Sequence, residues 1–173
     1  MFDVSQLRFG SVTDADLPRI KALEAASYPA DEAASEERLE FRLRAAPQWF
    51  RKAEWVSDEP GVAPRLIGYV VGTQSAGELT EASMASHDPI GDLLCVHSVV
   101  VDATFRRQGV ASMMLIDYIA YIRSISYSST VQKVVLIAKA DKCALYEKCG
   151  FTFVRESPVV HGVDRWNELE LRI

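Results

Sequence analysis

Apolar and polar residues follow two periods along the chain, and turn residues separate the segments. Strands are predicted where β-branched, aromatic and aliphatic residues alternate or cluster between turn signals, namely at 6–12, 49–56, 65–74, 93–101, 133–138, 151–156 and 165–173. Helices are predicted at 13–27, 36–46, 79–85, 111–122 and 142–149. Strands interleaved with helices predict an α/β fold with a mixed sheet of about seven strands, in one domain spanning 1–173.

The second predicted helix begins after Ser35, whose side chain can cap it. We expect Leu39, Phe41 and Leu43 to be its apolar residues, and Pro47 to end it. The strands on either side of the turn-rich segment 57–64 form an antiparallel hairpin in this interpretation.

Composition narrows the class of protein. Of the 173 residues, 49% are hydrophobic and 25% are charged, which is typical of a globular domain. The net charge of −5 argues against nucleic-acid binding. No apolar run reaches the roughly 18 residues of a membrane span. Three scattered cysteines and the lack of a signal peptide after Met1 favour a reduced, cytoplasmic protein without membrane partners.

A short basic turn joins the apolar strand at 93–101 to the next helix. It contains Arg106, Arg107 and Gly109, and Ala111 follows in the first helical turn. The first backbone N–H groups of a helix have no intrahelical partners and can bind a phosphate, which small residues let approach and arginines stabilise. A glycine here can equally serve only to bend the chain, so spacing alone leaves both interpretations open.

Two motifs carry a family resemblance. Arg106-x-x-Gly109-x-Ala111 fits the pattern [QR]-x-x-G-x-[GA], and about forty residues later "ALYEKCGF" (144–151) places a helix tyrosine before a Gly-Phe step. On these motifs the chain resembles the GCN5-related N-acetyltransferase (GNAT) family. Within residues 78–151, "ELTEASMASHDP" and "VHSVVVDATFRRQG" are similar to the arylalkylamine (serotonin) N-acetyltransferase branch.

The resemblance implies a GNAT fold and a role for acetyl-CoA as acetyl donor. It implies that a strand backbone binds the pantetheine arm and that the basic turn binds the pyrophosphate. The donor-binding residues expected on this basis are Val99, Val100, Val101, Arg106, Arg107, Gln108, Gly109, Val110, Ala111, Ser112 and Tyr146.

Three residues are the catalytic candidates. The resemblance implies that Tyr146 protonates the leaving thiolate and that His97 lies on a proton path from the amine. The branch has a second histidine two residues earlier, where this chain has Cys95, so His97 and water are expected to carry most of the proton transfer. Strand periodicity predicts that Cys95, His97 and Val99 share one face. Without the resemblance, His97 reads as a hydrogen-bonded core histidine.

The acceptor is expected to be a small primary amine, an arylalkylamine or a polyamine, attacked directly in a ternary complex. Tyr28 and Pro29 on a lid, with Val99 and Ile137, are the expected acceptor-binding residues. The chain is expected to be a monomer without a bound metal, and His87 and His161 to be solvated. A protein or peptide amine acetyltransferase and a non-catalytic acetyl-CoA-binding module remain the alternatives.

Overall fold

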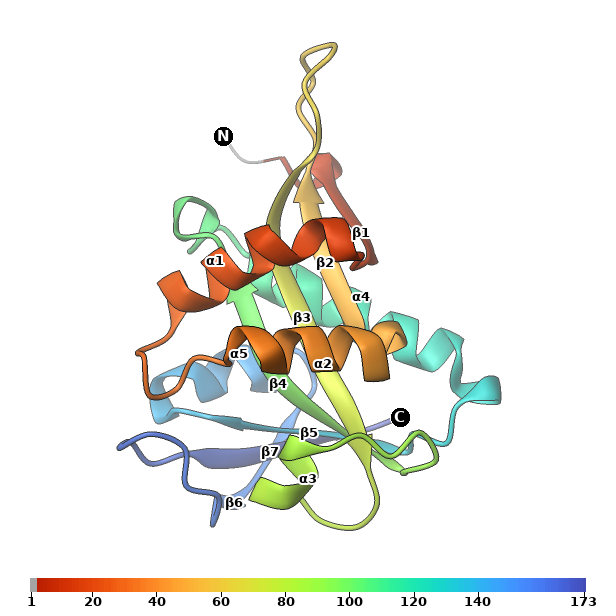
Figure 1. Cartoon of the computed structure of the whole chain (residues 1–173), viewed down its shortest axis with the longest axis vertical. Helices are drawn as coiled ribbons and strands as arrows, with labels where there is room; N and C mark the ends of the chain where they lie inside the picture. The colour runs from red at the N-terminus through yellow and green to blue at the C-terminus, as the bar shows by residue number, and fades with distance from the viewer. Residues whose placement is uncertain (1–2) are drawn as a thin grey trace.

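The computed structural model describes residues 3–173, and it forms a single curved sheet covered by helices on both faces (Figure 1). Seven strands pair in the order β1-β2-β3-β4-β5-β7-β6. Their bounds are Leu7–Ser11, Phe50–Trp55, Arg65–Ser75, Leu93–Val101, Lys133–Ala138, Thr152–Glu156 and Asn167–Arg172 for β1 to β7. All pairs are antiparallel except β4 with β5, so the predicted mixed sheet is confirmed.

Five α-helices connect the strands within the described residues. Their bounds are Leu17–Ser27, Glu36–Ala45, Glu81–Ala85, Val110–Ser124 and Cys143–Lys148 for α1 to α5. Helices α1 and α2 cross the front face of the sheet in Figure 1, whereas α4 lies behind it. The Ser35 hydroxyl accepts a hydrogen bond from Arg38 N at 3.3 Å, which confirms the predicted cap of α2.

Three apolar clusters hold these layers together. Behind the sheet, α4 buries Met114, Tyr118 and Ile122 against the central strands. In front, a second cluster joins α1 and α2 to β2, β3 and β4, and a third lies near α3. Trp49 and Phe50 are fully buried, as expected of sheet core residues.

The central strands part halfway along their length. The β4–β5 ladder runs from the pair Leu93–Lys133 to the pair Val96–Leu136, and within residues 3–173 it extends no further. At the same point β4 has a bulge: Val71 pairs with Ser98 and Gly72 with Val96, so His97 is the extra residue. The sheet therefore opens between β4 and β5 directly after His97.

Candidate functional site

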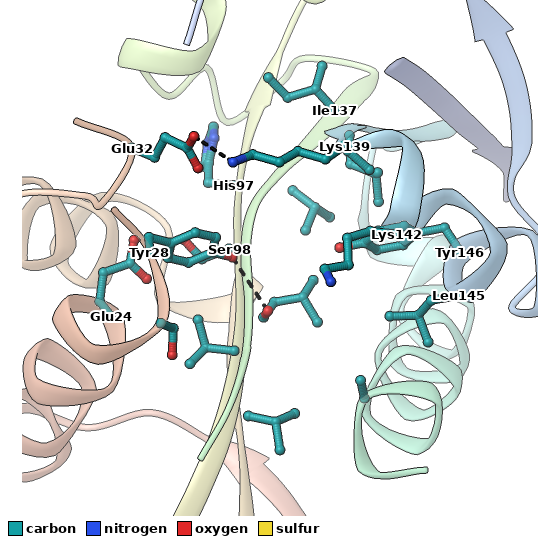
Figure 2. Close-up of a pocket in the computed structure, with 18 of the residues that line it drawn as sticks. Glu24, Tyr28, Glu32, His97, Ser98, Ile137, Lys139, Lys142, Leu145 and Tyr146 are labelled. Carbon is teal, nitrogen blue, oxygen red and sulfur yellow. Dashed lines mark hydrogen bonds and ion pairs between the residues drawn. The ribbon is translucent and has the colours of Figure 1, made fainter. Parts of the chain in front are cut away.

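A cavity of about 1170 Å³ occupies the opening between β4 and β5. One end is formed by the turn before α4, and the other by the loops α1–α2 and β6–β7. Val99, Val100 and Val101 of β4 line it between these ends. Figure 2 shows Tyr28 entering from the α1 side and Tyr146 from the α5 side, with β4 between them. The cavity is large enough for two substrates at once.

The turn before α4 has the backbone conformation of an anion-binding loop. Arg107 adopts a left-handed conformation (φ 62°), and Gly109, the N-cap of α4, has φ 84°. A glycine adopts such an angle without strain, and the 15-residue helix that follows presents its unpaired first N–H groups at the cavity. The turn can therefore accept a phosphate group, the role that the family resemblance implies.

Arg106 also links two elements of the fold through hydrogen bonds that the sequence does not predict. Its Nε donates to Val101 O at 2.8 Å and its Nη2 donates to Ser27 Oγ at 3.0 Å, so it ties the end of β4 to the end of α1. Arg107 is exposed and lines the cavity. The cavity lining also includes Gly109, Val110, Ala111 and Ser112. Gln108 is outside the cavity lining and donates to Thr104 O.

The two tyrosines differ in what they contact. The Tyr28 hydroxyl donates to Val99 O across 3.5 Å, which brings the segment after α1 onto β4. The Tyr146 ring packs edge-on against Phe151, with the ring centroids 5.9 Å apart. Burial raises the pKa of Tyr146 above its ordinary value. Tyr146 therefore keeps its proton at neutral pH and can give it to an anion formed in the cavity.

His97 lies at the bulge and lines the cavity. Its Nε2 is 2.7 Å from Thr73 Oγ1, whereas its Nδ1 is buried and has no hydrogen-bond partner among the described residues. Burial, together with the charges of Arg42 and Arg38, lowers the pKa of His97 well below its ordinary value. The imidazole is therefore neutral at pH 7.

The bulge overturns the expected parity of the strand. Cys95 packs with Leu93 in the cluster near α3, whereas Val99 packs with Leu94 and Val96 in the cluster behind the sheet. The prediction that Val99 shares the face of Cys95 is therefore wrong, because one extra residue at position 97 reverses the alternation. Cys95 is fully buried outside the cavity lining, and burial raises the pKa of its thiol to about 12.

The α1–α2 and β6–β7 loops are linked by ion pairs. The buried Glu32 carboxylate of the α1–α2 loop lies 2.7 Å from Lys139 Nζ at the end of β5, and Lys139 also pairs with Asp164 at 2.6 Å. His161 Nε2 is 2.9 Å from Glu32 O, so His161 is not simply solvated. We call Glu32, Lys139, Asp164 and His161 the loop clamp. Figure 2 shows the Glu32–Lys139 pair across the cavity.

Several other predicted residues lie where the sequence suggests. Ile137 and Pro29 line the cavity, with Pro29 exposed on the loop after α1. His87 is half-exposed outside the cavity lining, and its Nδ1 accepts a hydrogen bond from Gln74 N at 3.0 Å. Within residues 3–173, no helix is both long and apolar enough to cross a membrane.

Among the residues of the site that sequence reasoning misses, Arg42 is one whose signal is present in the sequence. Arg42 of α2 lines the cavity and is only 5% exposed, whereas Phe41, expected in the core, is 37% exposed. The signal is present in the sequence, because Arg42 follows Leu39 by three positions and so lies on the stripe that Leu39 and Leu43 bury. A charged residue on the apolar stripe of a helix indicates a buried charge and therefore a candidate for the site.

The sequence comparisons agree on one family. A family model described as acetyltransferase (GNAT) domain matches residues 55–153. Serotonin N-acetyltransferase of Mesocricetus auratus is 32% identical over 107 residues, which is 61% of this chain and 50% of that protein. The chain thus spans about half the length of the relative that it matches.

Solved structures share the fold at low sequence identity. The loading GNATL domain of CurA from Lyngbya majuscula superposes with a TM-score of 0.79 at 14% identity, covering 96% of this chain and 97% of that one. The NatC complex bound to Gag peptide and CoA contains a chain with a TM-score of 0.74 at 16% identity, covering 97% of this chain and 99% of that one. At these identities the likeness concerns the fold alone.

Proposed function

The chain belongs to the acetyltransferase (GNAT) domain family, and from this premise we propose that it transfers the acetyl group of acetyl-CoA to a small primary amine. The observation that carries the proposal is the order of groups along the cavity. The anion-binding turn lies at one end, Tyr146 in the middle, and His97 and the loop clamp beyond it. This order suits a donor with phosphates at one end and a thioester that meets an amine in the middle.

The reaction requires the amine to lose a proton. Alkylammonium groups have a pKa of about 10, so at pH 7 most of the amine arrives protonated. His97 is neutral and lines the cavity, so it can pass a proton through water toward solvent. The neutral amine then attacks the acetyl carbon that acetyl-CoA supplies, a carbon–nitrogen bond forms, and the carbon–sulfur bond breaks.

The departing thiolate requires a proton in return. Tyr146 is protonated at neutral pH and comes from the side of the cavity opposite Tyr28. We assign it as the general acid. We assign the donor arm to β4 at Val99 to Val101, which line the cavity between the two tyrosines. Cys95 has no part in this scheme, because its thiol is buried outside the cavity lining.

The charges around the cavity bear on the choice between an acceptor with one cationic end and a polyamine. Of the four carboxylates that line the cavity, Glu32 and Asp141 are ion-paired with lysines, whereas Glu24 and Glu81 accept hydrogen bonds from neutral donors. We favour an acceptor with one cationic end, because the cavity lining also includes the Arg42 guanidinium, whose buried Nη1 has no hydrogen-bond partner among residues 3–173.

A panel of acceptors tests the proposed function. Release of CoA from acetyl-CoA is measured with tryptamine, phenethylamine, phenylalanine, spermidine and a lysine peptide. Turnover of a small amine above the peptide supports the proposal. Preference for the peptide would indicate a protein amine acetyltransferase, and binding of acetyl-CoA without any turnover would indicate a binding module.

A further inference from the structure

Arg42 presents an unusual electrostatic situation at the acceptor end of the cavity. Its side chain is almost fully buried, and its Nη1 has no hydrogen-bond partner within residues 3–173. Burial and the nearby charge of Arg38 lower the pKa of Arg42 to about 10, so the guanidinium is still charged at pH 7. A buried guanidinium nitrogen without a hydrogen-bond partner destabilises a folded protein, so its presence calls for an explanation in function.

The nearest carboxylate does not provide the missing partner. Glu24 lies close enough to act on Arg42 through space, but both of its oxygens are already bonded. Oε1 accepts hydrogen bonds from Ala34 N at 2.8 Å and Ser98 Oγ at 3.2 Å, and Oε2 accepts one from the Tyr69 hydroxyl. Nη1 of Arg42 therefore remains available to a molecule in the cavity.

We propose that Arg42 binds an anionic group of the acceptor, so that the acceptor is an amine that also carries a carboxylate, as an amino acid does. The planar guanidinium matches a carboxylate through two parallel hydrogen bonds. Arg38 is exposed, lines the same cavity and adds positive charge at its mouth. The inference rests on the proposed function, since it names the class of amine that the same site takes.

The position of Arg42 assigns the anion to the acceptor rather than to the donor. Arg42 comes from α2, in front of the sheet, and its charge acts on His97. The anion-binding turn precedes α4, which lies on the opposite face. A carboxylate on Arg42 therefore lies beside the group that we assign to amine deprotonation, and away from the phosphates of the donor.

Matched pairs of acceptors test the inference. Rates are measured with phenylalanine and phenethylamine, and with tryptophan and tryptamine, each pair differing by one carboxylate. In the wild type we expect kcat/KM to favour the amino acid in at least one pair. Arg42→Gln should lower that preference at least about tenfold, because it removes a charge-assisted contact, and Arg42→Lys should restore part of it.

Arg44→Gln is the matched control, because Arg44 lies on the same helix, is exposed and is outside the cavity lining. It should leave the preference unchanged. A wild type that prefers the plain amine in both pairs, or an Arg42→Gln protein with unchanged preference, would overturn the inference.

Binding measurements separate this inference from the proposed function. N-acetylphenylalanine should raise the Tm of the wild type and N-acetylphenethylamine should raise it less, with the difference lost in Arg42→Gln. This outcome supports the carboxylate site even if no acceptor is turned over, and equal shifts refute it. If malonyl-CoA, but not acetyl-CoA, loses its stabilising effect in Arg42→Gln, the anion belongs to the donor and the inference is wrong.

The Tm of the unliganded variant separates loss of the contact from loss of the fold. Arg42→Met removes the buried guanidinium and with it the positive charge that acts on the buried Glu24 carboxylate, so we expect its Tm to fall while the amino-acid preference is also lost. A lower Tm, together with an unchanged preference, would show that Arg42 only supports the fold.

Discussion

Glu32 and Lys139 are 107 positions apart in the chain, and their carboxylate and ammonium groups lie 2.7 Å from each other at the cavity. Glu32 is buried there, whereas Lys139 also reaches Asp164 on the β6–β7 loop. Gly162 of that loop approaches so closely that an added Cβ would lie 2.8 Å from Glu32 Cγ. The α1–α2 and β6–β7 loops, which we propose enclose the acceptor, are therefore held together by charge and close packing.

Lys139→Met should weaken acceptor binding while leaving acetyl-CoA binding intact. The substitution leaves the buried Glu32 carboxylate without its ion-pair partner and releases the two loops from each other. We expect the KM for the amine to rise at least about fivefold with little change in kcat, as for loss of uniform binding. Lys133→Met is the control, because Lys133 pairs with Glu170 at the other end of β5. Equal effects in both variants would contradict the role of the loop clamp.

Arg107→Glu combined with Gly109→Asp should abolish most of the thermal stabilisation by acetyl-CoA. Both substitutions add a carboxylate at the turn that we assign to the pyrophosphate. The Asp also occupies a left-handed position, which glycine adopts without strain, so the Tm of the unliganded variant must be measured separately. An acetyl-CoA-induced shift equal to that of the wild type would refute the assignment of the turn.

Tyr146→Phe should lower kcat by roughly 10²-fold, which lies in the range of general acid–base catalysis. The ring contact with Phe151 remains in the variant, so the fold and acetyl-CoA binding should change little. Steady-state kinetics and the acetyl-CoA thermal shift are the two measurements. Wild-type turnover at every pH would exclude Tyr146 as the acid.

His97→Gln should lower kcat/KM more at pH 6 than at pH 9. Burial keeps the pKa of His97 well below its ordinary value, so the imidazole is neutral and competent over this whole range. The variant depends on amine that is already neutral, and that fraction grows about tenfold per pH unit below the pKa of the amine. A constant ratio of wild type to variant from pH 6 to 9 would leave His97 as a structural residue bonded to Thr73.

Asp102→Asn should destabilise the protein at neutral pH by about 1–3 kcal/mol. Although burial acts in the opposite direction, hydrogen bonds from Thr104 and pairs with Arg65 and Arg19 lower the pKa of Asp102 to about 2. A lowered pKa means that the carboxylate stabilises the fold above its ordinary value near 4, and that this contribution is lost as the pH falls toward 2. The difference between wild type and variant should therefore shrink on acidification.

Urea unfolding at pH 7 and at acid pH measures this effect. Asp117→Asn is the contrasting variant, because burial raises the pKa of Asp117. The folded state disfavours the ionised form of Asp117, so this carboxyl group stabilises the fold more as the pH falls, opposite to Asp102. A difference between wild type and Asp102→Asn that stays constant from neutral to acid pH would contradict the assigned role of Asp102.

The sequence predicts the fold well because its strong signals are local. The apolar runs at 93–101 and 133–138 coincide with β4 and β5, and the basic turn is found where the motif places it. His97 and Ser98 interrupt the apolar run of β4, but two polar residues in a strand do not indicate that one of them is an extra residue, so the bulge could not be predicted. The face of Val99 could therefore not be predicted from alternation.

The rest of the site depends on contacts between distant segments. Glu32 and Asp164 each read as residues of a polar loop, and only the folded chain brings them to Lys139. Arg42 is different, because the sequence alone places it on the same helix face as Leu39 and Leu43. What the sequence could not show is that Glu24, the carboxylate closest to it, is fully engaged by Tyr69, Ser98 and Ala34.

The parting of β4 from β5 has a consequence for self-association. Beyond Val96, β4 presents a strand edge in the interior of the sheet, and such an edge can pair with an extended segment of another molecule. Two carbonyls on this stretch are already occupied, because Tyr28 donates to Val99 O and Arg106 donates to Val101 O. These side chains shield the edge until an extended ligand lies along it. Loss of both side chains should therefore make the unliganded protein prone to aggregate. If these side chains served only to bind substrate, no such effect would be expected.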